Sequence, residues 1–107
     1  MDPNKLHDSL VQKGREKART AAYATTTDRL RKQVRAGFVV KFIGRGETVG
    51  KSEQMALIEP EYIEACERSE EAEEKAGVAA VEYAAAQAWV EVFRTLESTK
   101  RAEMTLR

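Results

Sequence analysis

The chain has 107 residues, which suffice for one small domain but not for two that fold independently. Charged residues make up 34% of it and aromatic residues 7%, and sixteen of its apolar residues are alanine, so a large core with a deep pocket is excluded and we expect no enzyme. The single cysteine and single histidine exclude an internal disulfide and most metal sites. We therefore expect no catalytic residue, no cofactor and no metal.

The N-terminus begins Met-Asp-Pro-Asn-Lys, without the apolar core of a signal peptide. No apolar run approaches the roughly 20 residues that a membrane span needs. We expect a cytoplasmic protein that does not contact a membrane.

Positive and negative charges are separated along the chain, although the formal net charge is zero. Residues 1–51 carry twelve Lys or Arg against five Asp or Glu, and residues 52–107 carry six against thirteen. A basic first half is typical of a nucleic-acid footprint. Equal and opposite halves also arise when two segments of a folded chain pair and neutralise each other. Both interpretations stay open at this point.

A basic N-terminal helix is predicted over residues 1–37. Asp2 is a good N-cap and Pro3 suits the first helical position, because its missing N–H costs nothing there. Apolar residues then recur at helical spacing, and Gly37 is a plausible C-cap. The β-branched run 25–27 is a weak point that favours a bend or a split of the helix.

A connector with a glycine-rich turn is predicted over residues 38–58. Residues 38–43 are the one stretch with strand character, and they fit an extended connector, a continuation of the helix or an edge for a partner. Ser52 is a candidate cap for a short helix that ends at Leu57. The preceding Gly-Lys-Ser invites a phosphate-loop interpretation, but position 45 is Arg where that motif requires glycine.

A long helix is predicted over residues 59–107, interrupted by nothing stronger than Gly77. Its length would reach nearly 70 Å at 1.5 Å per residue, too long for a compact chain of this size. We therefore expect an all-α fold, an antiparallel, coiled-coil-like helical hairpin that is oligomeric and forms one domain over 1–107. The seam of this helix alternates steps of four and three residues: Ala72, Ala76, Ala79, Tyr83, Ala86, Val90 and Phe93.

The hairpin predicts a register between the two helices. Leu30 and Val34 should meet Ile63 and Cys66 of the long helix, which would bury the cysteine. The register also pairs alanines with alanines, namely Ala18, Ala21 and Ala22 with Ala76 and Ala79. Finally, it pairs Arg29, Arg31, Lys32 and Arg35 with Glu61, Glu64, Glu67 and Glu70.

A second apolar stripe on the long helix predicts self-association. A two-helix hairpin lacks the depth to bury residues that lie off the first seam, and an exposed apolar patch is unusual for a monomer. The expected interface residues are Val81, Trp89, Val92 and Leu96, together with Phe93 of the first seam. The simplest assembly is a two-fold dimer with a four-helix arrangement.

Ten basic side chains of the first half are candidates for contacts with a phosphate backbone. They are Lys13, Arg15, Lys17, Arg19, Arg29, Arg31, Lys32, Arg35, Arg45 and Lys51.

Residues 46–107 resemble a group of small helical proteins of tailed bacteriophages. The resemblance lies in the run from Phe93 to Met104 after an Ala/Glu-rich helix, and in the step from Gly46 to Ser52-Glu53. Proteins of that group are similar in size and are often encoded beside recombination and replication genes. The resemblance implies a phage accessory protein in the bacterial host cytoplasm, and it supplies no catalytic residues.

Three functional hypotheses follow, of which a structural part of the virion ranks last. The first is a non-enzymatic accessory protein of phage DNA recombination or replication that binds DNA or a recombination protein. The alternative is a phage inhibitor or adaptor that binds a host enzyme or defence complex, with the acidic face of residues 59–74 as a mimic of nucleic acid.

Overall fold

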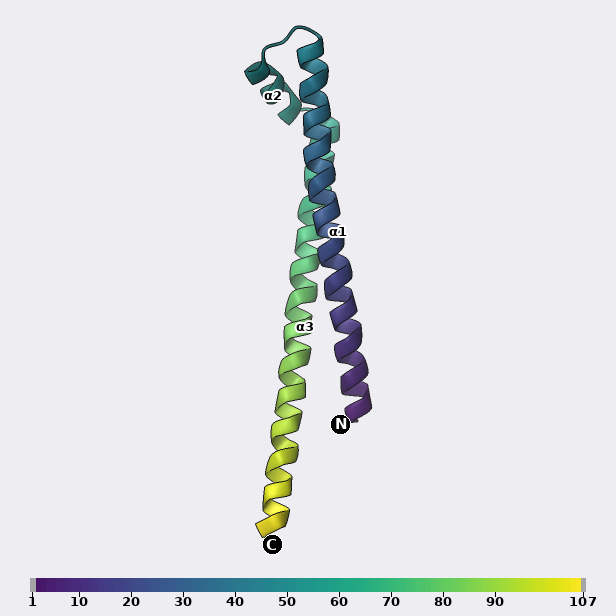
Figure 1. Ribbon diagram of the computed structural model, residues 1–107, viewed down its shortest axis with the longest axis vertical. Helices are drawn as coiled ribbons and strands as arrows, with labels where there is room; N and C mark the ends of the chain where they lie inside the picture. The colour runs from purple at the N-terminus through teal and green to yellow at the C-terminus, as the bar shows by residue number, and fades with distance from the viewer. Residues whose placement is uncertain (1, 107) are drawn as a thin grey trace. The chain divides into compact units, whose positions relative to one another are not determined.

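The computed structural model describes residues 2–106, and within this range the secondary structure is entirely helical (Figure 1). Helix α1 spans Pro3–Gly44, α2 spans Val49–Leu57 and α3 spans Pro60–Leu106. The all-α class predicted from the sequence is therefore confirmed.

The ends of the helices follow local capping rules. The Asn4 amide donates to Oδ1 of Asp2 at 2.9 Å, and Pro3 is the first residue of α1, as expected. Pro60 is likewise the first residue of α3. Gly46 has a φ of 96°, a conformation that favours glycine, in the turn that ends α1.

The first helix is longer than the sequence indicated. It passes through Gly37, so the C-cap prediction at that residue was wrong, and the connector is shorter than 38–58. Of the three interpretations left open for residues 38–43, the structure has a continued helix. Phe38 and Phe42, four residues apart, stack at 6.2 Å between ring centroids, and Phe42 is buried. Tertiary burial thus outweighs the strand propensity of this segment.

The threonine run at residues 25–27 does not break α1. Thr25 and Thr26 donate their hydroxyl protons to the carbonyl oxygens of Ala21 and Ala22, at 3.1 and 3.0 Å. Thr27 is buried and donates to the carbonyl of Ala24 at 2.9 Å. These bonds satisfy the hydroxyls inside the helix.

The short helix α2 begins earlier than expected, and its cap is Thr48 rather than Ser52. The Lys51 amide donates to Oγ1 of Thr48 at 3.3 Å. Ser52 and Ala56 have no exposed surface, so this helix is packed along one side.

The chain divides into two compact units. One joins Met1–Ala18 with Gly77–Arg107, and the other is Arg19–Ala76. Within Arg19–Ala76 the α1 and α3 segments lie side by side in opposite directions, with α2 beside the end of α1 (Figure 1).

Candidate binding surfaces

The predicted seam of α3 is its packed face. Each of its seven residues is buried or half-buried, and Ala72 and Ala79 are 1% and 5% exposed. The same spacing continues toward the start of α3 through buried Tyr62 and Ser69. The heptad interpretation of this helix is therefore confirmed.

In the unit that contains the termini, the seam is built around Tyr83. A Cβ on Gly14 would lie 3.2 Å from Cε2 of Tyr83, so the absence of a side chain in α1 makes room for the ring. Lys17 places its Nζ 5.0 Å from the centroid of that ring, a cation–π distance. Beside it, Lys13 and Glu82 form an ion pair at 3.0 Å between the two helices.

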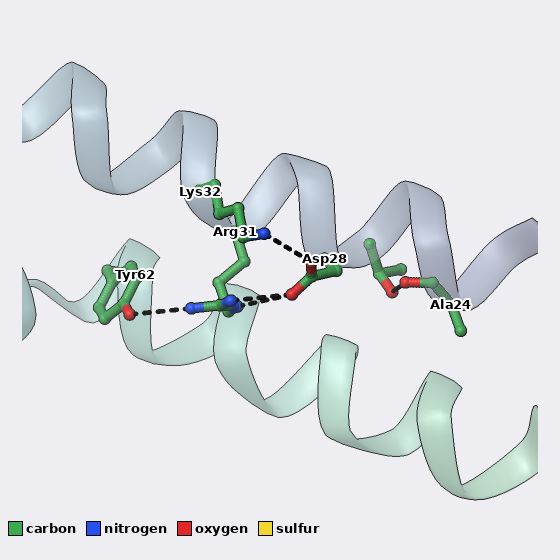
Figure 2. A network of polar contacts seen from close by, with 6 residues as sticks. Ala24, Asp28, Arg31, Lys32 and Tyr62 are labelled. Carbon is green, nitrogen blue, oxygen red and sulfur yellow. Dashed lines mark hydrogen bonds and ion pairs between the residues drawn. The ribbon is translucent and has the colours of Figure 1, made fainter. Parts of the chain in front are cut away.

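In Arg19–Ala76 the helices are joined by a polar network that the sequence analysis missed (Figure 2). Arg31 donates from Nη2 to Oδ1 of Asp28 at 2.8 Å and from Nη1 to the hydroxyl of Tyr62 at 3.3 Å. Lys32 binds Oδ2 of Asp28 at 3.2 Å. The bonds from Arg31 and then Lys32 lower the pKa of Asp28 from its usual 3.8, and Asp28 and Tyr62 raise the pKa of Arg31.

This network replaces the predicted row of ion pairs between Arg or Lys of α1 and Glu of α3. Arg31 and Lys32 form ion pairs with Asp28 of their own helix, and Glu64 forms an ion pair with Arg68 of α3 at 2.7 Å. The sequence does contain an indication of these pairs within α1, because Asp28 precedes Arg31 by three residues and Lys32 by four.

Small residues also pair differently from the prediction. Ala18, Ala21 and Ala22 are exposed, so the expected alanine-to-alanine contact is not made. The packed face of α1 is more polar: Thr20 and Ala24 are half-buried and Thr27 is buried.

A shallow groove of about 260 Å³ lies between α1 and α3 in Arg19–Ala76. Leu30, Val34 and Ala65 give it an apolar lining, with Glu61, Glu64 and Arg68 along its polar side. Leu30 and Val34 thus share this groove with residues from the start of α3, but Ile63 and Cys66, their predicted partners, do not line it. Ile63, however, is 45% exposed, and Cys66 is half-buried rather than buried.

The ten candidate phosphate-binding side chains belong to both compact units, three of them to the unit with the termini and seven to Arg19–Ala76. At least four of them are held in ion pairs, since Lys13 binds Glu82, Arg31 and Lys32 bind Asp28, and Lys51 binds Glu47 at 3.2 Å. Arg15, Lys17, Arg19, Arg29 and Arg45 are exposed, and Arg35 is half-buried.

The charge separation of the sequence disappears in the compact units. Arg19–Ala76 has ten Lys or Arg against eleven Asp or Glu, and the other unit has eight against seven. Segments of the basic and acidic halves come together in each unit.

Helix α3 carries an exposed apolar stripe opposite its packed seam, in the segment after Gly77. Trp89 is 57% exposed, Leu96 57%, Val81 70% and Val92 47%. Val78 extends the stripe at 53% exposure, and it was missed by the sequence analysis. Phe93, the fifth predicted interface residue, is half-buried and belongs to the packed seam instead.

Three observations on residues 2–106 bear on metal, phosphate and membrane binding. No group of three or more His, Cys, Asp or Glu in residues 2–106 is placed to hold a metal ion. His7 is exposed, and the glycine-rich turn before α2 follows a helix rather than a strand. None of the helices over this range combines the length and apolar character of a bilayer span.

Comparisons of the chain with protein-family models, with curated proteins and with solved structures gave no match.

Proposed function

We propose that the chain is a non-enzymatic binding protein that folds as an antiparallel helical hairpin and self-associates through α3. The observation that carries this proposal is the exposed apolar stripe, defined as Val78, Val81, Trp89, Val92 and Leu96. Fully burying a large apolar side chain contributes roughly 1.5–3 kcal/mol, so several of them on one helix face favour association. Contiguous exposed patches of this kind mark interaction sites in soluble proteins.

The binding of a protein explains the surface better than the binding of DNA. A protein that binds DNA without reading its sequence needs several unneutralised cations along one face. Here at least four of the ten candidate cations are ion-paired, and each compact unit is close to neutral. Within the phage context that the resemblance implies, the function is that of an accessory protein in the bacterial cytoplasm that binds a recombination or replication protein.

A second candidate function rests on the acidic side of α3. Glu61, Glu67, Glu70, Glu71 and Glu74 are all exposed within one stretch of that helix. Such a face would let the protein act as an inhibitor or adaptor on a host enzyme or defence complex that normally binds nucleic acid.

Self-association is tested by the fluorescence of the single tryptophan. Because Trp89 is more than half exposed in one chain, association through the stripe should bury it and shift its emission to shorter wavelength. Dilution from high to low micromolar concentration should reverse the shift. Emission that stays that of an exposed indole at every concentration would contradict self-association through the stripe.

Binding of labelled single- and double-stranded DNA, measured between about 50 and 200 mM salt, separates the remaining alternatives. The proposal predicts no binding across this range. Binding that weakens steeply with salt would instead favour DNA as the partner.

The second candidate function is tested by affinity purification from host lysate. The purification is compared between the wild type and a Glu70→Gln/Glu71→Gln/Glu74→Gln variant. A single host nucleic-acid-binding protein that binds the wild type and not the variant supports this function.

A further inference from the structure

The exposed stripe of α3 has a graded arrangement of large and small residues. Val81, Ala85, Ala88, Trp89, Val92 and Leu96 are all exposed and recur at helical spacing on one face. The alanines lie in the middle of the stripe, next to the indole, and the branched aliphatic residues lie toward its ends.

The area of the stripe suits a second copy of the same chain. The large residues of the stripe are 47–70% exposed, and they are Val78, Val81, Trp89, Val92 and Leu96. An aromatic side chain such as that of Trp89 has about 150–250 Å² of surface and the valines and Leu96 have less, so the stripe offers at most on the order of 500 Å² of apolar surface. Two copies would together bury at most on the order of 1,000 Å², which is the smallest area expected of a specific interface and less than the roughly 1,200–2,000 Å² of stable ones.

The order of large and small residues decides between the two possible two-fold pairings. A parallel pair places every residue opposite its own copy, so Trp89 would meet Trp89 and Ala85 would meet Ala85. Such a pair leaves voids at the alanines and crowds the indoles. An antiparallel pair centred between Ala88 and Trp89 places Trp89 opposite Ala88, Val92 opposite Ala85 and Leu96 opposite Val81. Large residues then fill the space beside small ones, as close packing requires.

We infer that two copies of α3 pair antiparallel through this stripe, with the two-fold axis between Ala88 and Trp89. The inference rests on the proposed self-association and adds its partner, direction and register. In an isologous interface each contact occurs twice, so two Leu96–Val81 contacts flank the axis. Antiparallel helix macrodipoles also oppose each other favourably.

Disulfide cross-linking tests the register. In a Cys66→Ala background, Val81→Cys and Leu96→Cys variants are prepared separately, then oxidised alone and as an equimolar mixture. Both positions are exposed in the single chain, so the substitutions leave its own packing intact. A disulfide forms readily only when the Cα atoms come within about 7 Å of each other. The antiparallel pairing predicts a cross-linked dimer in the mixture and almost none from either variant alone.

The control replaces Leu96→Cys with Ser98→Cys, which is exposed but lies off the stripe. A mixture of Ser98→Cys with Val81→Cys should not cross-link. Cross-linking of Val81→Cys with itself would overturn the inference in favour of a parallel pair. A dimeric mass by light scattering with no cross-link in any sample would overturn the register and leave self-association standing. A monomeric mass at every concentration would overturn self-association as well.

Discussion

Gly14 of α1 faces the ring of Tyr83 in α3 so closely that a Cβ on the glycine would lie 3.2 Å from Cε2 of the tyrosine. Glycine in a helix costs about 1 kcal/mol relative to alanine, so this residue is tolerated for the space it leaves. Gly14, which lowers the helix propensity of α1, thus lies against Tyr83, the largest side chain of the α3 seam. A glycine at this position therefore lets α1 approach α3 closely.

Gly14, Gly37 and Gly77, which lie inside the two long helices, should therefore respond differently to alanine. A Cβ on Gly37 or on Gly77 meets nothing within 4 Å, so Gly37→Ala and Gly77→Ala should each raise the free energy of unfolding by about 1 kcal/mol. Gly14→Ala should raise the free energy of unfolding by clearly less, because the added Cβ requires the ring of Tyr83 to move. Thermal unfolding of the three variants checks this, and equal gains at all three positions would contradict the contact.

Removal of the Tyr62 hydroxyl should weaken the junction of α1 and α3. Tyr62→Phe loses the hydrogen bond that Arg31 donates, at an expected cost of about 1 kcal/mol in the free energy of unfolding. Tyr23→Phe is the matched control, since Tyr23 is 57% exposed, and its stability should change by less than about 0.5 kcal/mol. Chemical denaturation measures both, and indistinguishable midpoints would argue against the network.

Acid should loosen the same junction through Asp28. Its pKa in the folded chain is below 3.8 because Arg31 and Lys32 bind its charged form. Its contribution to stability is therefore complete above the unfolded pKa, near 3.8, and is lost as the pH falls through the folded value. In Asp28→Asn this part of the decline below pH 4 should be absent, as thermal unfolding at a series of pH values will show. A carboxyl titration midpoint for Asp28 at or above 3.8 would contradict the assignment.

Ser52 is expected to be a stabilising site for substitution. Its hydroxyl oxygen is fully buried in α2 and has no hydrogen-bond partner among the described residues. Ser52→Ala removes an unsatisfied polar group and should raise the free energy of unfolding by about 1 kcal/mol or more. Ser98→Ala, at an exposed helical position, reports the smaller gain from helix propensity alone. A loss of stability in Ser52→Ala would mean that the hydroxyl is satisfied after all.

The parts of the fold that the sequence predicted are those where hydrophobicity and helical spacing agree. The seam of α3 repeats alanine and aromatic residues at steps of three and four. The exposed stripe was found by the same rule, apart from Val78, and from Phe93, which was assigned to the stripe but lies on the seam.

The packed face of α1 was harder to predict because it is polar. Steps of four and three from Leu6 and Leu10 lead to Lys13, Lys17 and Thr20, which hydrophobicity alone places in solvent. The prediction placed Ala18 and Ala21 on the packed face of α1 instead, although alanine is small enough to lie on either face of a helix. Continuing the heptad count through polar residues would have found the correct face.

Residues 38–43 were misjudged for a different reason. Their β-branched and aromatic residues favour a strand when taken alone, but no second strand exists in the described part of the chain. The spacing of Phe38 and Phe42 was the available signal for a helix, since it places both rings on one face.

The most direct test of self-association through the α3 stripe is the mass in solution of the wild type, of Leu96→Glu and of Ser98→Glu at the same micromolar concentration. Both variants add one carboxylate at an exposed position of the same helix. Sedimentation equilibrium should give the wild type and Ser98→Glu twice the chain mass of 12.0 kDa, and Leu96→Glu the mass of one chain. A wild type that sediments as one chain, or a Leu96→Glu variant that stays dimeric, would contradict the account.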